Sequence, residues 1–210
     1  MRYSPFAILA SLALVPVLVQ AAPHSYNTID IDYVDAELDP FDGNGWSIRG
    51  SGNIADHIYL FGQYSDVGTD RSGLDLDVER LSLGGGYQVS PNIENLNVFG
   101  QISFEDVQAD SDVPRFDADG SGFGLEAGVR YAVMPRLEVT VSGRYLDVDE
   151  YFDGELGGTV GVVYDVLPWL GLSLDYDYNN IDISGDRGED ERILAGVRLY
   201  WDQLPIPGRE

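Results

Sequence analysis

The chain carries few of the side chains on which enzyme catalysis usually depends. It has two histidines, His24 and His57, no cysteine, and no Gly-x-Ser-x-Gly segment. A nucleophilic serine or cysteine usually needs a neighbouring histidine as its base. His24 lies near the start of the chain and His57 in a short link between two apolar segments. We therefore predict no catalytic residue and no cofactor-binding residue.

Arginines and carboxylates recur at alternate positions of several segments, where they could form ion pairs. All basic residues are arginine, whose guanidinium can bind a carboxylate through two hydrogen bonds. The tight link at Pro135 predicts that positions summing to about 270 face each other across a hairpin. Arg144 should then lie opposite Glu126, and Glu138 diagonal to Arg130. The full predicted set is Asp30, Asp32, Arg49, Arg80, Glu126, Arg130, Glu138, Arg144, Asp175, Asp177, Arg192 and Arg198.

Five segments are dense in acidic residues, and the formal net charge is −24. Hard divalent cations such as Ca²⁺ and Mg²⁺ prefer oxygen ligands, so these segments could bind them at an anionic lipopolysaccharide surface. Asp117 and Asp119, just before Gly120, resemble part of a calcium loop but lack its third ligand and its later Glu. A solvated, repulsive surface is the alternative. Nucleic acid is excluded as a partner because it requires a basic surface.

The elements that position these residues show a period of two, which is typical of β-strands with unlike faces. In the segment 137–145, for example, Leu, Val, Val, Gly and Tyr alternate with Glu, Thr, Ser and Arg. Each segment has about the 9–11 residues that a tilted strand needs to cross a bilayer. We predict ten strands at 27–35, 45–54, 58–66, 77–89, 96–105, 122–133, 137–146, 156–166, 170–179 and 191–201. Eight is the alternative count, because Ile58–Phe61 is apolar on both faces.

The predicted connections alternate in length, and the apolar face has aromatic residues at both ends. Short links near residues 55–57, 90–95, 134–136 and 167–169 alternate with longer acidic ones at 36–44, 67–76, 106–121, 147–155 and 180–190. Short periplasmic turns and long outer loops are typical of an outer-membrane barrel. Two aromatic girdles at the interfaces are also expected. They comprise Tyr33, Trp46, Tyr64, Phe104, Phe123, Tyr145 and Tyr178 on the loop side, and Tyr87, Tyr131, Tyr164 and Trp201 on the turn side.

The N-terminus has the features of a secretory signal. Arg2 precedes an apolar run from Phe6 to Val19, and small residues offer cleavage after Ala21 or Ala22. A transmembrane anchor is the alternative, but the run is short and contains Pro16. We therefore predict a signal peptide over 1–22, a barrel domain over 23–201 and a short periplasmic tail over 202–210.

The combined pattern predicts an all-β protein: a closed antiparallel transmembrane barrel with polar side chains inside. A soluble sandwich or lipocalin-like barrel would also alternate. Glycines on the polar face and aromatics at strand ends favour the membrane form. Neither histidine would reach the outer rim, where active sites of outer-membrane enzymes lie. We expect a structural or surface-interaction role, with a narrow channel as the alternative. The expected partners are outer-membrane lipid, lipopolysaccharide and the barrel assembly machinery.

Several segments resemble the Ax21-type small outer-membrane β-barrel proteins of xanthomonads and related proteobacteria. They are Ser25–Asn27, Asn44–Ser51, Leu60–Ser65, Leu83–Tyr87 and Leu125–Arg130. The resemblance spans nearly the whole chain and implies a protein of the Gram-negative outer membrane, with outer-membrane vesicles as a second location. It brings no catalytic or ligand residues, and the family's former link to quorum-type signalling is not carried over. The tail after Trp201 departs from the usual aromatic end of a barrel, so Val197, Leu199 and Trp201 would act as an internal assembly signal.

Overall fold

Ten antiparallel strands account for nearly all of the structure, a computed structural model that describes residues 24–38, 41–71, 74–111, 118–149, 152–183 and 186–205. They are β1 (Thr28–Leu38), β2 (Phe41–Ala55), β3 (Ile58–Arg71), β4 (Leu74–Val89), β5 (Leu96–Ser111), β6 (Ala118–Met134), β7 (Leu137–Val148), β8 (Phe152–Leu167), β9 (Leu170–Ile183) and β10 (Asp186–Tyr200). The 3-10 helix η2 (Trp201–Gln203) follows β10. Within the described residues, no helix has the length and apolar character needed to cross a membrane.

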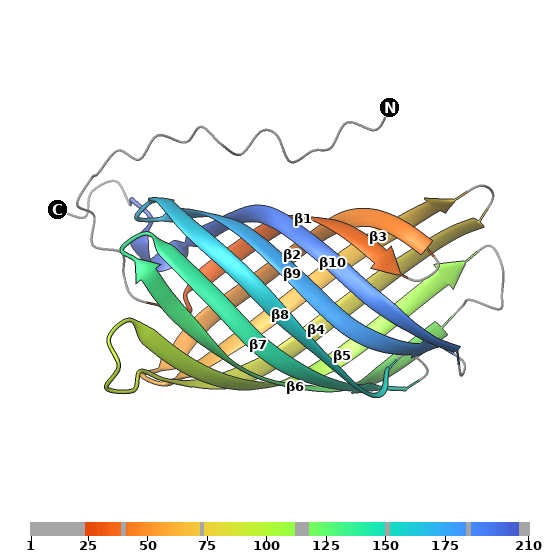
Figure 1. The fold of residues 1–210 in the computed structure, drawn as a ribbon, viewed down its shortest axis with the longest axis horizontal. Coiled ribbons are helices and arrows are strands. Elements are labelled where there is room, and N and C mark those ends of the chain that lie inside the picture. The colour runs from red at the N-terminus through yellow and green to blue at the C-terminus, as the bar shows by residue number, and fades with distance from the viewer. Residues whose placement is uncertain are drawn as a thin grey trace.

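The sheet closes on itself. Each strand pairs with its neighbour in the chain, and β1 pairs with β10 from Thr28↔Tyr200 to Leu38↔Asp190. Closure leaves no unpaired sheet edge, which is the condition for strands to lie in lipid. The strands are inclined to the long axis of the barrel (Figure 1). The prediction of a closed ten-stranded barrel is confirmed, and the eight-stranded alternative is wrong.

The structure explains why the start of β3, Ile58–Phe61, is apolar on both faces. Tyr59 and Phe61 point inward from β3 and are buried, while Ile58 and Leu60 point outward and are exposed. Inside, Tyr59 and Phe61 pack with Tyr26 and Phe99 as one apolar cluster. Gly86 on β4 makes room for the Tyr59 ring, because a Cβ at that position would overlap it. The first two inward residues of this strand are therefore aromatic instead of polar, which hid the alternation.

The two ends of the barrel differ less in their connections than the sequence suggested. The turn side carries the links after β2, β4, β6 and β8, and the loop side carries the links after the odd-numbered strands. Most residues of the predicted long acidic loops belong to strands: β1 runs on to Leu38, and β2 already begins at Phe41. The prediction of long loops at 36–44, 67–76, 106–121, 147–155 and 180–190 was wrong to that extent.

These extensions were missed because the polarity of the strands inverts along their length. Within the membrane-facing part of β1, Ile31 and Tyr33 point outward, and Asp30 and Asp32 point inward. Two residues further on the inward side chain is Val34, while the outward Asp35 is exposed. Beyond the lipid, an outward side chain faces water, so carboxylates outside and small apolar groups inside suit the same strand. The period of two continues with its faces exchanged.

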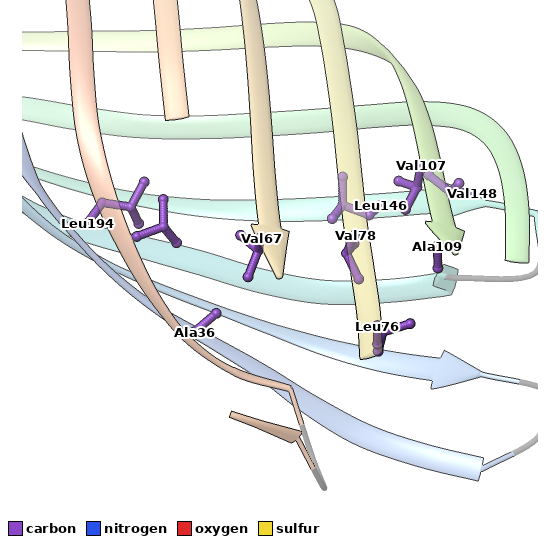
Figure 2. Close-up of a cluster of buried hydrophobic side chains, with 10 residues drawn as sticks. Ala36, Val67, Leu76, Val78, Val107, Ala109, Leu146, Val148 and Leu194 are labelled. Carbon is purple, nitrogen blue, oxygen red and sulfur yellow. The ribbon is translucent and has the colours of Figure 1, made fainter. Parts of the chain in front are cut away.

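Where the polarity of the strands is exchanged, their inward apolar side chains pack together inside the loop-side end of the barrel. We call it the loop-side cluster: Val34, Ala36, Val67, Leu76, Val78, Val107, Ala109, Leu146, Val148 and Leu194, from β1, β3, β4, β5, β7 and β10. Figure 2 shows these side chains gathered within the ring of strands. None is more than 7% exposed. At this end of the barrel the interior is therefore largely apolar, with the buried Arg192–Asp190 pair beside the cluster.

The outward face carries the large apolar side chains, which are exposed because lipid would cover them. All predicted girdle residues point outward, with Tyr33, Tyr87 and Trp201 among the most exposed aromatics. On the loop side, Trp46 lies 5.3 Å from Tyr64 between ring centroids, and Phe123 lies 6.1 Å from Tyr145. The predicted signal peptide over 1–22 lies outside the described residues, as do residues 206–210 of the tail.

Removal of a side chain from the loop-side cluster should leave a cavity that lipid cannot fill. We expect Leu146→Ala, at a residue 1% exposed, to lower the free energy of unfolding by about 3 kcal/mol. Leu174→Ala on the lipid face is the matched control and should cost about 1.5 kcal/mol, because only the transfer term is lost. Urea unfolding in lipid vesicles measures both, and equal losses would contradict a packed cluster.

Candidate functional site

The inward positions of the ten strands place the predicted charged residues around a common lumen. Strand parity determines this, because side chains alternate between lipid and lumen. The neighbouring β6 and β7 show it clearly: Glu126 lies directly opposite Arg144, in the register expected from the link at Pro135. Glycines make the narrow interior possible. At Gly161 and Gly196 a Cβ would overlap the carboxylates of Asp175 and Asp32.

The centre of the lumen is held by Arg144 and Glu126. Arg144 Nε lies 3.3 Å from Glu126 Oε2, and its Nη2 donates to Thr159 Oγ1 at 3.1 Å. Thr159 in turn donates to Asp177 at 2.6 Å. Gln101 donates to the same Glu126 oxygen at 2.8 Å. This network joins β5, β6, β7, β8 and β9 across the barrel.

The turn-side end is held by a second network around Glu138. Arg130 Nη2 lies 2.6 Å from Glu138 Oε1, and Arg198 Nη1 lies 3.8 Å from the same oxygen. Arg198 also donates to Asp30 on β1 at 2.5 Å. His24 Nδ1 lies 2.7 Å from the other carboxylate oxygen, Oε2. The network therefore spans the seam where β1 meets β10.

Two acidic partners on the loop side were absent from the predicted set. Arg80 forms an ion pair with Glu105, 2.9 Å from Nη2 to Oε2, and Glu105 also accepts from Ser82 and Ser103. Arg192 pairs with Asp190 at 2.8 Å. Strand parity relative to Phe104 would have identified Glu105. Asp190 was missed because it falls in a segment interpreted as a loop.

Three predicted lumen residues, Asp32, Arg49 and the already described Asp177, have neutral hydrogen-bond partners instead of an opposite charge. Asp32 accepts a hydrogen bond from Ser173 at 2.9 Å. Arg49 donates to Gln101 at 3.3 Å and lies 4.9 Å above the Phe61 ring. Asp175 lines a cavity in the turn-side half of the lumen. The lumen is thus a mixture of ion pairs, amide and hydroxyl bonds, and aromatic contacts.

The lumen holds two cavities with a polar partition between them. The inner cavity, toward the turn side, measures about 120 Å³, and the outer one about 40 Å³. Both cavities exceed the roughly 10–15 Å³ that a cavity needs to hold a water molecule. Residues that line both cavities, and therefore separate them, are Arg49, Gln63, Gln101, Glu126, Arg144, Asp177 and Leu194. The loop-side cluster adjoins the outer cavity through Val34 and Leu194.

The candidate cation ligands do not come together as a closed metal site. Asp119 lies on the outer face of β6 and is exposed, and Asp117 lies outside the described residues. Among the side chains that the structure describes, no group of three or more His, Cys, Asp or Glu is placed to hold a metal ion. Acidic residues instead face each other in pairs on the outer surface of the strand extensions. Asp77 is opposite Asp110, Asp66 opposite Glu79, and Glu37 opposite Asp42.

The two histidines lie near the turn-side end. His57 is exposed in the link after β2, with its ring centroid 5.7 Å from that of Tyr87. His24 is buried, and besides Glu138 it contacts the carbonyl oxygen of Asn95 at 3.0 Å. The sequence placed His24 near the start of the chain and gave no reason to expect it inside the barrel.

A closed sheet with lipid-facing apolar residues and a charged interior defines a transmembrane β-barrel. The sequence matches the family described as outer membrane protein beta-barrel domain over residues 6–156, and the chain belongs to that family. It is therefore an outer-membrane protein. No curated protein matches it significantly.

The chain is similar to several solved barrels of the outer membrane. The NanC porin is 10% identical with a TM-score of 0.50, over 80% of this chain and 98% of the porin chain. Neisserial surface protein A is 16% identical with a TM-score of 0.44, over 83% and 95%. Ail of Yersinia pestis, in complex with the heparin analogue sucrose octasulfate, is 14% identical with a TM-score of 0.41, over 82% and 95%. At these identities the likeness concerns the fold alone.

Breaking the central ion pair should be costly because Arg144 would keep its charge inside the barrel. We expect Glu126→Gln to lower the free energy of unfolding by about 3 kcal/mol. Glu94→Gln, in the exposed link before β5, is the control and should change it by no more than about 0.5 kcal/mol. Urea unfolding followed by tryptophan fluorescence measures both. Similar values for the two variants would show that the pair contributes little.

Proposed function

We propose that this protein is a non-enzymatic outer-membrane barrel with a closed lumen, acting in membrane structure or in surface interactions. The observation that carries the proposal is the loop-side cluster, in which ten apolar side chains fill one end of the barrel. Its apolar side chains cannot replace the water shell of a hydrated ion, which costs several kcal/mol, and the buried Arg192 and Asp190 beside them are bonded to each other. The Arg–carboxylate networks place bonded side chains around and between the two cavities in the rest of the lumen.

A narrow channel is the second candidate, because two polar cavities follow one another along the lumen. They adjoin at the partition that contains Arg49, Glu126 and Arg144. A charged constriction of this kind can select ions where a continuous water path exists. In this barrel the path would also have to cross the loop-side cluster, which favours the closed form.

Single-channel recording in planar bilayers separates the two candidates. We expect no steady conductance above background for the refolded protein. The variant Val67→Ser/Val107→Ser/Leu146→Ser, which makes the loop-side cluster polar, should conduct, because water can enter a polar section. Lipid-facing Val141→Ser/Val160→Ser is the control and should stay silent. Steady conductance from the unmodified protein would overturn the closed-lumen proposal.

For the outer surface, we propose an interaction with divalent cations and lipopolysaccharide. Like charges directly opposite each other on neighbouring strands are destabilising. The facing pairs Asp77/Asp110 and Asp66/Glu79 therefore gain from a bridging Ca²⁺ or Mg²⁺, which could also bind lipopolysaccharide phosphates. The proposal includes Asp117 and Asp119 as ligands in the same role.

Calcium should therefore stabilise the folded barrel. We expect millimolar CaCl₂ to raise the unfolding temperature by a few degrees, since a ligand that binds only the folded state stabilises it. Asp77→Asn/Asp110→Asn should reduce the rise, whereas lumen-facing Asp165→Asn should leave it unchanged. NaCl of equal ionic strength is the solvent control. An unchanged unfolding temperature in calcium would exclude the cation role.

The same proposal includes the finer assignments that the sequence suggests. We place the protein with the Ax21-type barrels of Gram-negative bacteria, in the outer membrane and on its vesicles, after removal of residues 1–22. Insertion would require the barrel assembly machinery. Trp201, whose Nε1 donates to Ser51 O at 3.0 Å across the seam, supports Val197, Leu199 and Trp201 as the end that this machinery reads.

A further inference from the structure

The segment that precedes β1 enters the barrel instead of leaving it. His24 and Tyr26 are both buried, at 8% and 6% exposure. His24 has a φ of 53°, in the left-handed region that costs a non-glycine residue free energy. Such a conformation persists only where the surroundings hold it. The contacts of this segment are therefore the point of interest.

Residues 24–26 contact the barrel wall on strands far from their own. Tyr26 Oη donates to Asn97 Oδ1 on β5 at 2.8 Å, and its ring centroid lies 4.3 Å from that of Tyr59 on β3. The Arg130 guanidinium lies 4.6 Å from the centre of the same ring, and Arg130 Nη1 donates to Ser25 O at 3.1 Å. The segment crosses the turn-side mouth and ties β3, β5 and β6 to the chain start.

The wall offers acceptors that suit this segment. Glu138 Oε1 is taken by Arg130, and its Oε2 receives His24 at 2.7 Å. Asn97 is 1% exposed, and its Nδ2 donates to Gln88 and Ser90 while its Oδ1 receives Tyr26. Glu138 and Asn97 thus each have one side-chain oxygen that accepts a hydrogen bond from the segment, as residues of a binding site do with a ligand. A buried acceptor without a donor would be costly.

From this fit we propose that His24–Tyr26 is a plug bound in a peptide-binding site at the turn-side mouth, and that it closes the inner cavity to the periplasm. Ser25 and Tyr26 line that cavity together with Thr140 and Arg198. The plug lies before β1 and forms no part of the sheet, so it can leave without breaking a strand pair. The inference goes beyond the closed-lumen proposal and does not depend on it, because the loop-side cluster would still block conduction after the plug had left.

A single cysteine inside the inner cavity tests the plug. The chain has no cysteine, so Thr140→Cys gives one reporter, labelled with 2-aminoethyl methanethiosulfonate and read by mass spectrometry. We expect His24→Ala/Tyr26→Ala to accelerate labelling about tenfold or more, as expected when a locally closed state opens. His57→Ala, at the exposed histidine, is the matched control and should leave the rate unchanged.

Three outcomes would overturn the proposal. They are equal labelling with and without the plug residues, equal acceleration by His57→Ala, or labelling of the unmodified plug protein as fast as that of an exposed Asp56→Cys. Heat-modifiable gel mobility checks folding. If the double variant does not fold, Tyr26→Phe replaces it. That variant keeps the ring but loses the hydroxyl and its bond to Asn97, and should accelerate labelling a few-fold.

The binding site itself is tested in trans. A synthetic peptide with the sequence of residues 24–29 should slow labelling of the His24→Ala/Tyr26→Ala variant, while the same peptide with alanine in place of Tyr26 should not. Failure of the first peptide, or equal protection by both, would refute a specific site. Bilayer recordings of the plug variant keep the two proposals apart: conductance would refute the closed lumen, whereas faster labelling without conductance supports both.

Discussion

A ten-stranded barrel must fill its own interior, and most of the structure follows from this requirement. Closure satisfies the backbone groups that lipid could not. It also encloses a narrow space in which every inward polar group needs a partner from the opposite or adjacent wall. Arginine meets the need well, because one guanidinium reaches several acceptors at once, as Arg144 does with Glu126 and Thr159. The glycines at Gly161 and Gly196 follow from the same constraint, since the carboxylates beside them need the space.

Several strands pass from lipid into water along their length, and the exchange of polarity between their two faces marks the boundary. Around the girdle residue Tyr33, β1 presents Ile31 to lipid and Asp32 to the lumen. A little further on it presents Asp35 to water and Val34 to the interior. The loop-side end of the barrel has polar residues outside and apolar residues inside, as in a soluble β-protein. The membrane-spanning part has apolar residues outside and polar residues inside, as in a membrane protein. The loop-side cluster is a consequence of this exchange, because apolar residues occupy the inward positions where the outward positions face water.

The period of two was enough to predict the strands, their pairing and the lumen residues near Arg144, because register and parity depend only on local sequence. The prediction failed beyond the lipid, where outward residues face water and are therefore polar. The acids between β1 and β2 suggested a loop because outward positions were assumed to face lipid throughout, and Asp190 was lost for the same reason. The place of His24 could not be predicted, because it depends on its own left-handed backbone conformation and on acceptors from two distant parts of the chain, Glu138 and Asn95.

The two ends of the lumen are closed by different means, and this difference has a mechanical consequence. The loop-side cluster consists of strand side chains, so opening it requires that several paired strands move together. The turn-side mouth is closed by residues outside the sheet, held by Glu138, Asn97 and Arg130. These bonds can exchange for water one at a time, whereas strand pairs around a closed barrel separate cooperatively. Any reversible opening of this barrel should therefore begin on the turn side and reach the central ion pairs before it reaches the apolar section.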